Sequence, residues 1–368
     1  MAWRGLAAVL AALLISACSD STGTGASSGT SGAGSTGSSG SSSSGGSGAS
    51  PITAPDDTWT WVDFPDSKCA NGSPTGMGIN PHSGSTDLLI YLEGGGACSS
   101  GASCWGPDPT ASALDGYDAA KFAATPQLHL PIFARGTRVG SPFASANQVF
   151  VPYCTGDLHA GTAEVDLAYG GTSYPTWFWG AKDIDLFMAR VKATFPGVER
   201  VWLAGGSAGG FGSFLAYQNV TAAFPGLRVD IIDDSGPAIS PKGATSNPTL
   251  ARYGFQPPAG CASPCDSHAK VLASDRAAQP NSKYAFLSYA EDPTISADMG
   301  YTLDEYPAVI DDYVSSLSSD PNAAAFVVTN KQSHVVDNEP QLAPEYLPWL
   351  TLMVNDDSSW ADVTYQHP

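Results

Sequence analysis

The chain has 368 residues, of which 35 are acidic and 16 are lysine or arginine, so its formal net charge at pH 7 is −19. This excess of negative charge argues against a nucleic-acid-binding protein and weighs against tight binding of a strongly anionic polymer. Once an N-terminal signal and linker are set aside, enough chain remains for one large α/β domain.

Residues 1–17 have the pattern of an export signal. Arg4 precedes an apolar run over residues 6–15 that is too short to span a bilayer. The sequence Ile15-Ser16-Ala17-Cys18 resembles a bacterial lipobox, which predicts lipidation at Cys18 and an exported outer-membrane or cell-surface lipoprotein, or one released outside the cell. An ordinary signal peptide with a chance cysteine is the alternative.

Residues 19–50 consist almost entirely of Ser, Gly, Thr and Ala. Such a composition cannot bury a hydrophobic core, so this stretch is predicted to be a flexible tether that spans about 30 Å. The expected division is a signal peptide at 1–17, a lipidated linker at 18–50 and a globular catalytic domain at 51–368.

The globular part contains an even number of cysteines, which in an exported chain indicates three disulfide bonds. The six residues are Cys69, Cys98, Cys104, Cys154, Cys261 and Cys265. Short spacing suggests the pairs Cys98–Cys104 and Cys261–Cys265, which leaves Cys69 with Cys154. A metal site made by Cys261, Cys265 and His268 is the alternative.

Strand-like and helix-like segments alternate along the domain. Strands are expected at 87–92, 148–153, 200–204, 229–232, 284–289 and 324–328, and helices at 181–194, 211–220, 303–317 and 347–354. The alternation predicts an α/β fold class with a mainly parallel central sheet and helices on both faces. Residues 236–280 are expected to form a loop-rich cap, and the aromatics at 169–179 either fill the core or form a sugar platform.

The strongest motif lies at residues 201–211, where a strand meets Gly205-Gly206-Ser207-Ala208-Gly209 and a helix follows. Small neighbours permit a sharp turn that lifts the Ser207 hydroxyl above the sheet and aims helix N–H groups at a reacting carbonyl. The same Gly-x-Ser-x-Gly pattern occurs in the linker at 25–29 without a strand or a helix. Context therefore favours Ser207 as a nucleophile over a turn needed only for close packing.

A second glycine-rich loop, at residues 94–96, follows the expected strand at 87–92. In an α/β-hydrolase the loop at this position supplies half of the oxyanion hole. We therefore expect the N–H groups of Ala208 and of Gly95 or Gly96 to bind the oxyanion. An ordinary glycine-rich turn is the alternative.

The acid and histidine of an α/β-hydrolase follow the nucleophile on loops after late strands. Among the histidines after Ser207, only His334 comes just after a strand; His268 lies in the cap and His367 is the penultimate residue. His334 is thus expected to take the proton of Ser207 and pass it to the leaving alcohol.

Asp292, which follows the expected strand at 284–289, is the predicted acid that orients the imidazole. The rival acids are Glu291, Asp298, Asp233 and Asp234. His159 is expected to be a solvated loop histidine, with a supporting or substrate contact as the alternative. This chemistry requires neither a metal nor another cofactor.

The chain resembles the pectin acetylesterase/Notum family of serine carboxylesterases. The matching segments follow the family's order: Cys69-Ala70-Asn71-Gly72-Ser73-Pro74, Leu92-Glu93-Gly94-Gly95-Gly96, Pro152-Tyr153-Cys154, residues 204–210, Asp234-Ser235-Gly236 and Ser333-His334. The resemblance implies an α/β-hydrolase fold, ester hydrolysis and no metal, with the family's nucleophile at Ser207, its histidine at His334 and its acid at Asp292. An aromatic residue is frequent in the family where Gly96 and Ala97 stand here, so the acyl pocket is expected to differ.

The expected function is that of a tethered serine carboxylesterase that removes acetyl or another short acyl group from a polysaccharide such as pectin. The expected partners are this acylated substrate and, only through Cys18, a membrane. The scarcity of basic residues makes pectin itself the weakest part of this expectation. The alternatives are a longer-chain acyl or polyester hydrolase, a non-catalytic glycan-binding lipoprotein, and a peptidase with the same triad.

Overall fold

The computed structural model describes residues 49–110, 112–136 and 140–368. The expected signal peptide, Cys18 and nearly all of the linker lie outside these residues. Within them, no helix combines the length and the apolar character needed to cross a lipid bilayer.

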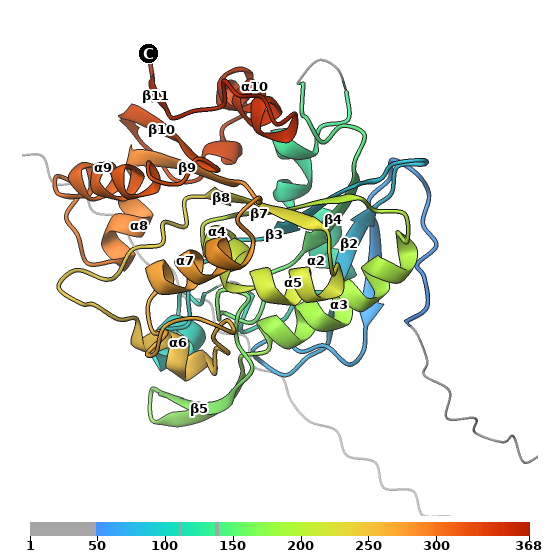
Figure 1. Cartoon of the computed structure of the whole chain (residues 1–368). Helices are drawn as coiled ribbons and strands as arrows, with labels where there is room; N and C mark the ends of the chain where they lie inside the picture. Colours follow the sequence, from blue (N-terminus) through green and yellow to red (C-terminus); the bar gives the residue numbers. More distant parts are fainter. Residues whose placement is uncertain (1–48, 111, 137–139) are drawn as a thin grey trace, which may run out of the picture. The chain divides into compact units, whose positions relative to one another are not determined.

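A nine-stranded sheet organises this part of the chain, in the order β1-β2-β4-β3-β7-β8-β9-β10-β11 (Figure 1). Neighbours from β4 to β11 are parallel, whereas β1 and β2 extend one side of the sheet in antiparallel fashion. The strands are β1 Thr60–Phe64, β2 Thr75–Asn80, β3 Asp87–Leu92, β4 Asn147–Val151, β7 Arg200–Gly206, β8 Arg228–Asp234, β9 Tyr284–Glu291, β10 Ala323–Gln332 and β11 Val363–Gln366.

Helices cover both faces of the sheet, which confirms the predicted architecture. The α-helices are α1 Gly101–Trp105, α2 Ala119–Ala124, α3 Gly180–Thr194, α4 Ala208–Leu215, α5 Tyr217–Ala223, α6 Pro248–Tyr253, α7 His268–Ala278, α8 Pro293–Asp298, α9 Tyr306–Leu317 and α10 Ala343–Val354. Short 3-10 helices are η1 Pro126–His129, η2 Pro131–Phe133, η3 Val336–Asn338 and η4 Pro340–Leu342. The cap region thus contains α6 and α7 rather than loops alone.

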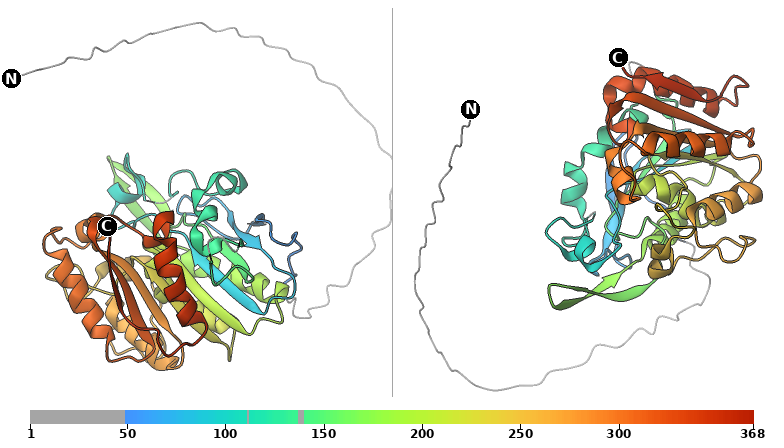
Figure 2. Two further views of the ribbon diagram at one scale, coloured as in Figure 1. Left: turned by 90° about the horizontal axis from the view of Figure 1, so that it is seen from above. Right: turned by 90° about the vertical axis from the view of Figure 1, so that its left-hand side faces the viewer.

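Strand alternation explains the two layers of helices. Leu88 and Ile90 of β3 pack into one core cluster with α3, α4, α5, α7 and α9, while Leu89 and Tyr91 pack into another with α2 and α10. In Figure 1, α3 and α5 lie below the sheet and α10 lies above it, and Figure 2 shows α10 over the strands from above. Since the strands from β4 to β11 are parallel, their carboxyl ends meet at one edge, where ligands bind in such sheets.

Three residues of the aromatic stretch at 169–179, Tyr169, Tyr174 and Trp177, belong to a separate hairpin of β5 (Glu164–Tyr169) and β6 (Thr172–Trp177), which projects from the body (Figure 2). The rings of Trp105 and Tyr174 stack with centroids 5.2 Å apart. Trp105 Nε1 also donates to Thr176 Oγ1 at 3.0 Å. Tyr174 thus packs the hairpin against α1, and Phe178 is buried, so at least these two rings fill the core.

The three disulfide bonds are Cys69–Cys154, Cys98–Cys104 and Cys261–Cys265, the pairing expected from the sequence. Because the sulfurs of Cys261 and Cys265 are bonded to each other, they do not form the alternative metal site with His268. His268 Nε2 instead lies 3.1 Å from Asn247 Nδ2.

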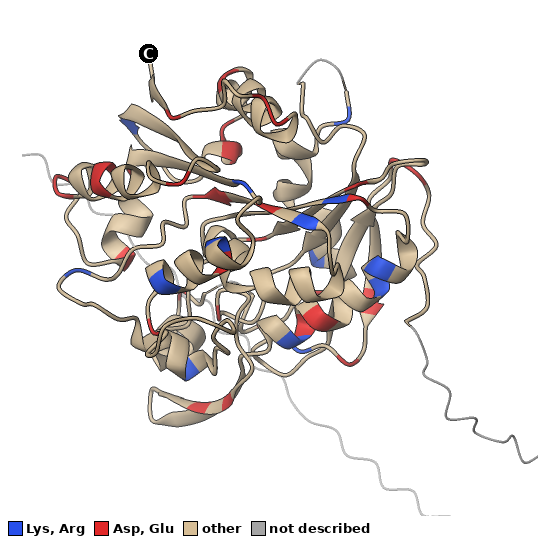
Figure 3. Cartoon of the chain, viewed as in Figure 1, with Lys and Arg blue, Asp and Glu red and all other residues tan. Residues whose placement is uncertain are grey.

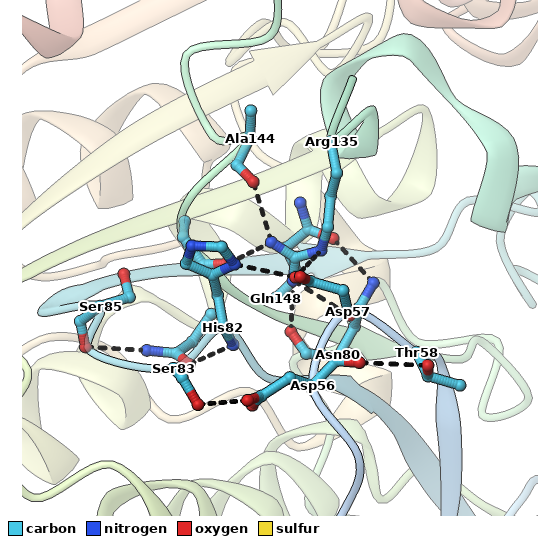
Figure 4. Close-up of polar contacts among 12 residues, drawn as sticks. Asp56, Asp57, Thr58, Asn80, His82, Ser83, Ser85, Arg135, Ala144 and Gln148 are labelled. Atoms are coloured by element: carbon cyan, nitrogen blue, oxygen red, sulfur yellow. Dashed lines mark hydrogen bonds and ion pairs between the residues drawn. The ribbon is translucent and has the colours of Figure 1, made fainter. Parts of the chain in front are cut away.

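A polar network around Arg135 connects the N-terminal segment of the domain, at Asp57, to the end of β2, at Asn80 (Figure 4). The guanidinium donates to the carbonyl and Oδ1 of Asn80 at 2.7 and 3.0 Å, and its Nε lies 3.0 Å from Asp57 Oδ1. A hydrogen bond from His82 and the nearby Arg135 charge lower the pKa of Asp57, whose side chain is exposed. His82 N donates to Asn147, at the amino end of β4, so this network lies at the edge of the sheet opposite the carboxyl ends.

Candidate active site

The turn between β7 and α4 carries Ser207. Its backbone has φ 56° and ψ −120°, values that residues other than glycine rarely adopt. Ala208, the first residue of α4, follows it directly. The Ser207 N–H donates to the carbonyl of Asp234 on β8 at 2.7 Å. A Cβ at Gly209 would lie 1.9 Å from the carbonyl oxygen of Leu92, so only glycine lets α4 pack this closely against the end of β3.

The glycine loop after β3 lies beside this serine. A Cβ at Gly94 would lie 2.4 Å from the carbonyl oxygen of Gly206 and 3.0 Å from Ser207 Cβ. Within the described ranges, no hydrogen bond occupies the N–H groups of Gly95, Gly96 or Ala208. These donors flank the serine, and that of Ala208 is at a helix N-terminus, so the arrangement suits an oxyanion.

Two buried side chains, those of His159 and Glu93, hold the start of the glycine loop in place. His159 Nε2 donates to the Glu93 carbonyl at 2.8 Å, and Glu93 Oε2 accepts from the Tyr153 N–H at 2.9 Å. His159 is 2 % exposed, so the expectation of a solvated loop histidine was wrong. Burial lowers the pKa of His159 to about 4 and raises the pKa of Glu93 to about 8. Both groups are therefore mainly uncharged at neutral pH.

His334 and Asp292 lie together at the same edge of the sheet. His334 Nδ1 is 2.7 Å from Asp292 Oδ2, and Asp292 is fully buried. His334 Nε2 has no hydrogen-bond partner among the described residues. His334 and Ser207 line one cavity of about 330 Å³. The structure thus brings together the three side chains expected from the sequence, with one imidazole nitrogen available.

The rival acids have other partners. Glu291 accepts from Gln332, and Asp298 lies on the wall of a second cavity beside Ser207. Asp233 accepts from the Tyr284 hydroxyl and the Gly236 N–H. The Asp234 carboxylate accepts backbone N–H groups in the turn that follows His334. Among these acids only Asp292 hydrogen-bonds the imidazole.

The second cavity beside Ser207 has a volume of about 150 Å³. Its apolar wall includes Leu158, Phe211, Ile295 and Met299, and its polar wall includes Asn247, Thr249 and His268. Ala97, at the position where the family often has an aromatic residue, also lines it. Burial lowers the pKa of His268 to about 4, so this imidazole is uncharged at neutral pH, and the carboxyl of Asp298 also lines the cavity.

The larger cavity, on the His334 side, is lined by uncharged polar side chains from three separate loops or short helices: Gln127, Thr294 and Asn338. Sequence reasoning missed these residues and the wall residues Asn247 and Thr249. They belong to no motif, and only the folded chain brings them to Ser207.

The order of the sheet, the serine turn after β7 and the His334–Asp292 pair after β10 and β9 define a protein of the α/β-hydrolase class. The family model described as "PAE: Pectinacetylesterase" matches residues 60–281, which is more than half of the chain. The chain therefore belongs to the pectinacetylesterase family.

Among curated proteins, the chain is similar to the palmitoleoyl-protein carboxylesterase NOTUM of Mus musculus, with 27 % identity over 174 residues that cover 46 % of this chain. The Homo sapiens protein of the same name is 26 % identical over 174 residues. The matches span about a third of the length of these relatives, 33 % and 34 %.

Among solved structures, that of the Wnt deacylase Notum from Drosophila superposes with a TM-score of 0.61 at 15 % identity. The match covers 84 % of this chain and 98 % of that one. A second crystal form gives the same TM-score at 17 % identity. At this identity the likeness bears on the fold, which is that of an α/β-hydrolase.

Proposed function

We propose that this protein is a serine carboxylesterase that removes acetyl or another short acyl group from a polysaccharide. The observation that carries the proposal is the 2.7 Å contact between His334 and Asp292 beside Ser207: His334 and Ser207 line one cavity, and His334 Nε2 has no hydrogen-bond partner in the described part of the chain. The family's name and those of its relatives, which are carboxylesterases, support the same chemistry.

In the proposed reaction, Ser207 Oγ attacks the acyl carbon and its proton passes to His334 Nε2. The N–H groups of Ala208 and of Gly95 or Gly96 stabilise the oxyanion of the tetrahedral intermediate. The C–O bond to the alcohol then breaks, and the alcohol oxygen takes the proton from His334. Water, activated in turn by His334, releases the acid from Ser207. Side chains and backbone groups supply every step.

The size of the smaller cavity favours a short acyl group. A volume of about 150 Å³ is that of a cavity that holds benzene, so the cavity suits acetyl and slightly longer groups better than a palmitoleoyl chain. This volume supports a short acyl group over the palmitoleoyl group in the names of the curated relatives, and over the longer-chain alternative.

The larger cavity is the proposed site of the alcohol, because His334, which must protonate the leaving oxygen, lies there. Gln127, Thr294 and Asn338 offer hydrogen bonds suited to sugar hydroxyls, and the lining includes no lysine or arginine. Figure 3 shows the basic residues dispersed over several elements in this view. An uncharged acetylated polysaccharide therefore suits the site better than a polyuronate such as pectin.

The test is hydrolysis of p-nitrophenyl esters of increasing acyl length by the purified protein and its Ser207→Ala variant. We expect acetate to be cleaved fastest and turnover to vanish in the variant. Acetylated xylan and acetylated pectin are then compared as polymers. Preference for long acyl chains would move the assignment to lipid or polyester substrates. Retained turnover in Ser207→Ala, or none in the wild type, would reject it.

We further propose that the protein is exported and anchored through a lipid on Cys18. The three disulfide bonds among the described residues suit an oxidising compartment. Labelled fatty acid should be incorporated into the wild-type chain in bacteria and not into a Cys18→Ala variant. A chain released without lipid would indicate an ordinary signal peptide instead.

A further inference from the structure

The turn that follows His334 has a strained backbone. Val335 has φ 63° and ψ 109°, and a β-branched residue at positive φ is a genuine outlier. Ser207 and Ser235, at the ends of neighbouring strands, also have positive φ, 56° and 68°. Such conformations persist only where the surrounding structure holds them, and they cluster at functional sites.

Two side chains at the end of β8 hold this turn. Asp234 Oδ1 accepts from the Val336 N–H and Asp234 Oδ2 from the Asp337 N–H, both at 2.8 Å. The Ser235 hydroxyl accepts from the Val335 N–H at 3.2 Å and donates to Asp234 Oδ1 at 3.1 Å. The three consecutive N–H groups after His334 therefore all donate to the side chains of Asp234 and Ser235.

The same aspartate also contacts the nucleophile turn. Its backbone carbonyl accepts the Ser207 N–H at 2.7 Å, while its side chain, 4 % exposed, binds the histidine turn. Asp234 thereby joins the two segments whose separation sets the Ser207–His334 geometry. None of the acids proposed for the triad other than Asp234 hydrogen-bonds both segments in the described part of the chain.

We propose that Asp234, assisted by Ser235, is a positioning residue that holds the imidazole of His334 in place for Ser207 by fixing the strained turn at Val335. This inference rests on the proposed catalytic roles of Ser207 and His334. It assigns to Asp234 and Ser235 a task in the reaction, although neither side chain is required to touch the substrate.

The carboxylate form suits this task, because each of its two oxygens accepts one N–H, and hydrogen bonds to a charged acceptor are the stronger kind. Burial raises the pKa of Asp234 to about 6 against the opposing effect of these hydrogen bonds and the His334 charge. The other titratable groups around it include two acids, Asp233 and Asp337, and three tyrosines, Tyr91, Tyr289 and Tyr346. An asparagine would offer only one acceptor oxygen, and its amide N–H group would face one of these two backbone N–H groups.

The first test compares Asp234→Asn with Asp233→Asn in the full chain. Asp233 is also buried, but its carboxyl binds Tyr284 and Gly236 rather than the histidine turn. Because small misplacements of reacting groups are costly, we expect kcat for p-nitrophenyl acetate to fall about 100-fold in Asp234→Asn with KM within about twofold. Asp233→Asn should keep kcat within about threefold of the wild type.

A double-mutant cycle separates positioning from a general loss of stability. Glycine adopts positive φ without strain, so in Val335→Gly the turn no longer needs the hydrogen bonds of Asp234 to hold a strained backbone. We expect Asp234→Asn to lower kcat only about tenfold in the Val335→Gly background, against about 100-fold in the wild type. Equal effects in both backgrounds would overturn the role assigned to the strained turn.

Amide hydrogen exchange gives a readout that does not depend on activity. The Val336 and Asp337 N–H groups should exchange at least about tenfold faster in Asp234→Asn and at the wild-type rate in Asp233→Asn. Slow exchange together with unchanged kcat in Asp234→Asn would reject the proposal. Failure of the proposed function would be seen separately, as Ser207-independent turnover, while the exchange rates would still report whether Asp234 holds the turn.

Discussion

One carboxylate, that of Asp292, both orients His334 and begins a helix. Its Oδ2 lies 2.7 Å from His334 Nδ1, and its Oδ1 accepts the N–H groups of Thr294 and Ile295 at 2.9 and 3.0 Å. The start of α8 therefore fixes the plane of the carboxylate, which in turn fixes the imidazole with its proton on Nδ1. Helix capping and the proposed catalytic role support each other at this residue.

Replacing Asp292 by asparagine should preserve the fold and remove most of the activity. The amide oxygen can still cap α8, but an amide N–H facing Nδ1 favours the wrong tautomer of His334. We expect kcat to fall about 10⁴-fold, as measured by p-nitrophenyl acetate hydrolysis. Glu291→Gln is the matched control, because Glu291 contacts Gln332 rather than the imidazole, and it should stay near wild-type kcat. A reversed outcome for the two variants would assign the acid to Glu291.

Gly94→Ala tests the close approach of the glycine loop to the serine turn. Its Cβ would meet the Gly206 carbonyl at 2.4 Å, so the loop must move and carry the donors of Gly95 and Gly96 away from the oxyanion. We expect kcat to fall about 10²–10³-fold, the cost of losing one such donor. Gly197→Ala is the control, since its Cβ would have nothing within 4 Å. Comparable kcat in the two variants would show that the loop does not bind the oxyanion.

Elements with a strong local signal could be predicted from the sequence. The expected strand at 87–92 coincides with β3, because a continuous apolar run specifies a buried parallel strand. The serine turn could be placed as well, since its glycines and the flanking strand and helix are neighbours in sequence. The expected helix at 211–220 was only partly right, because α4 ends at Leu215 and α5 begins at Tyr217.

Features set by contacts between distant segments could not be predicted. Strand β2 contains Gly76 and Gly78, which lower strand propensity, and its pairing with β1 and β4 determines its conformation. The burial of His159 depends on the loop that it supports, and the wall residue Asn247 reaches the site from the cap. The link between Asp234 and the histidine turn joins residues about a hundred positions apart, a contact with no local signature.

Enlarging the smaller cavity, the proposed site of the acyl group, should change the preference for acyl length. Met299 lines this cavity, so Met299→Ala removes several atoms from its wall. We expect the ratio of kcat/KM for hexanoate to that for acetate to rise about tenfold, within the range that small changes in a hydrophobic pocket produce. Met353→Ala, a buried methionine on the opposite face of the sheet, controls for lost stability. An unchanged ratio in Met299→Ala would place the acyl group elsewhere.

Buried Glu93 should make the stability of the protein depend on pH. Burial raises the pKa of Glu93 from an ordinary value of 4.5 to about 8, so between these limits the folded state holds a proton that the unfolded state has released. The contribution of Glu93 to the free energy of unfolding must then fall as pH rises from 4.5 to 8, by at most about 1.4 kcal/mol per pH unit.

Glu93→Gln isolates this contribution, because its amide oxygen still accepts the Tyr153 N–H while the side chain cannot ionise. Urea unfolding at pH 5 and pH 8 should show that the wild type loses more stability than the variant as pH rises, since the other buried acids are common to both proteins. Glu345→Gln, at an exposed position on α10, controls for the removal of one carboxylate. Parallel pH profiles for the wild type and Glu93→Gln would mean that Glu93 is already ionised in the folded protein. The glycine loop would then have a negative charge beside it, which disfavours the developing oxyanion.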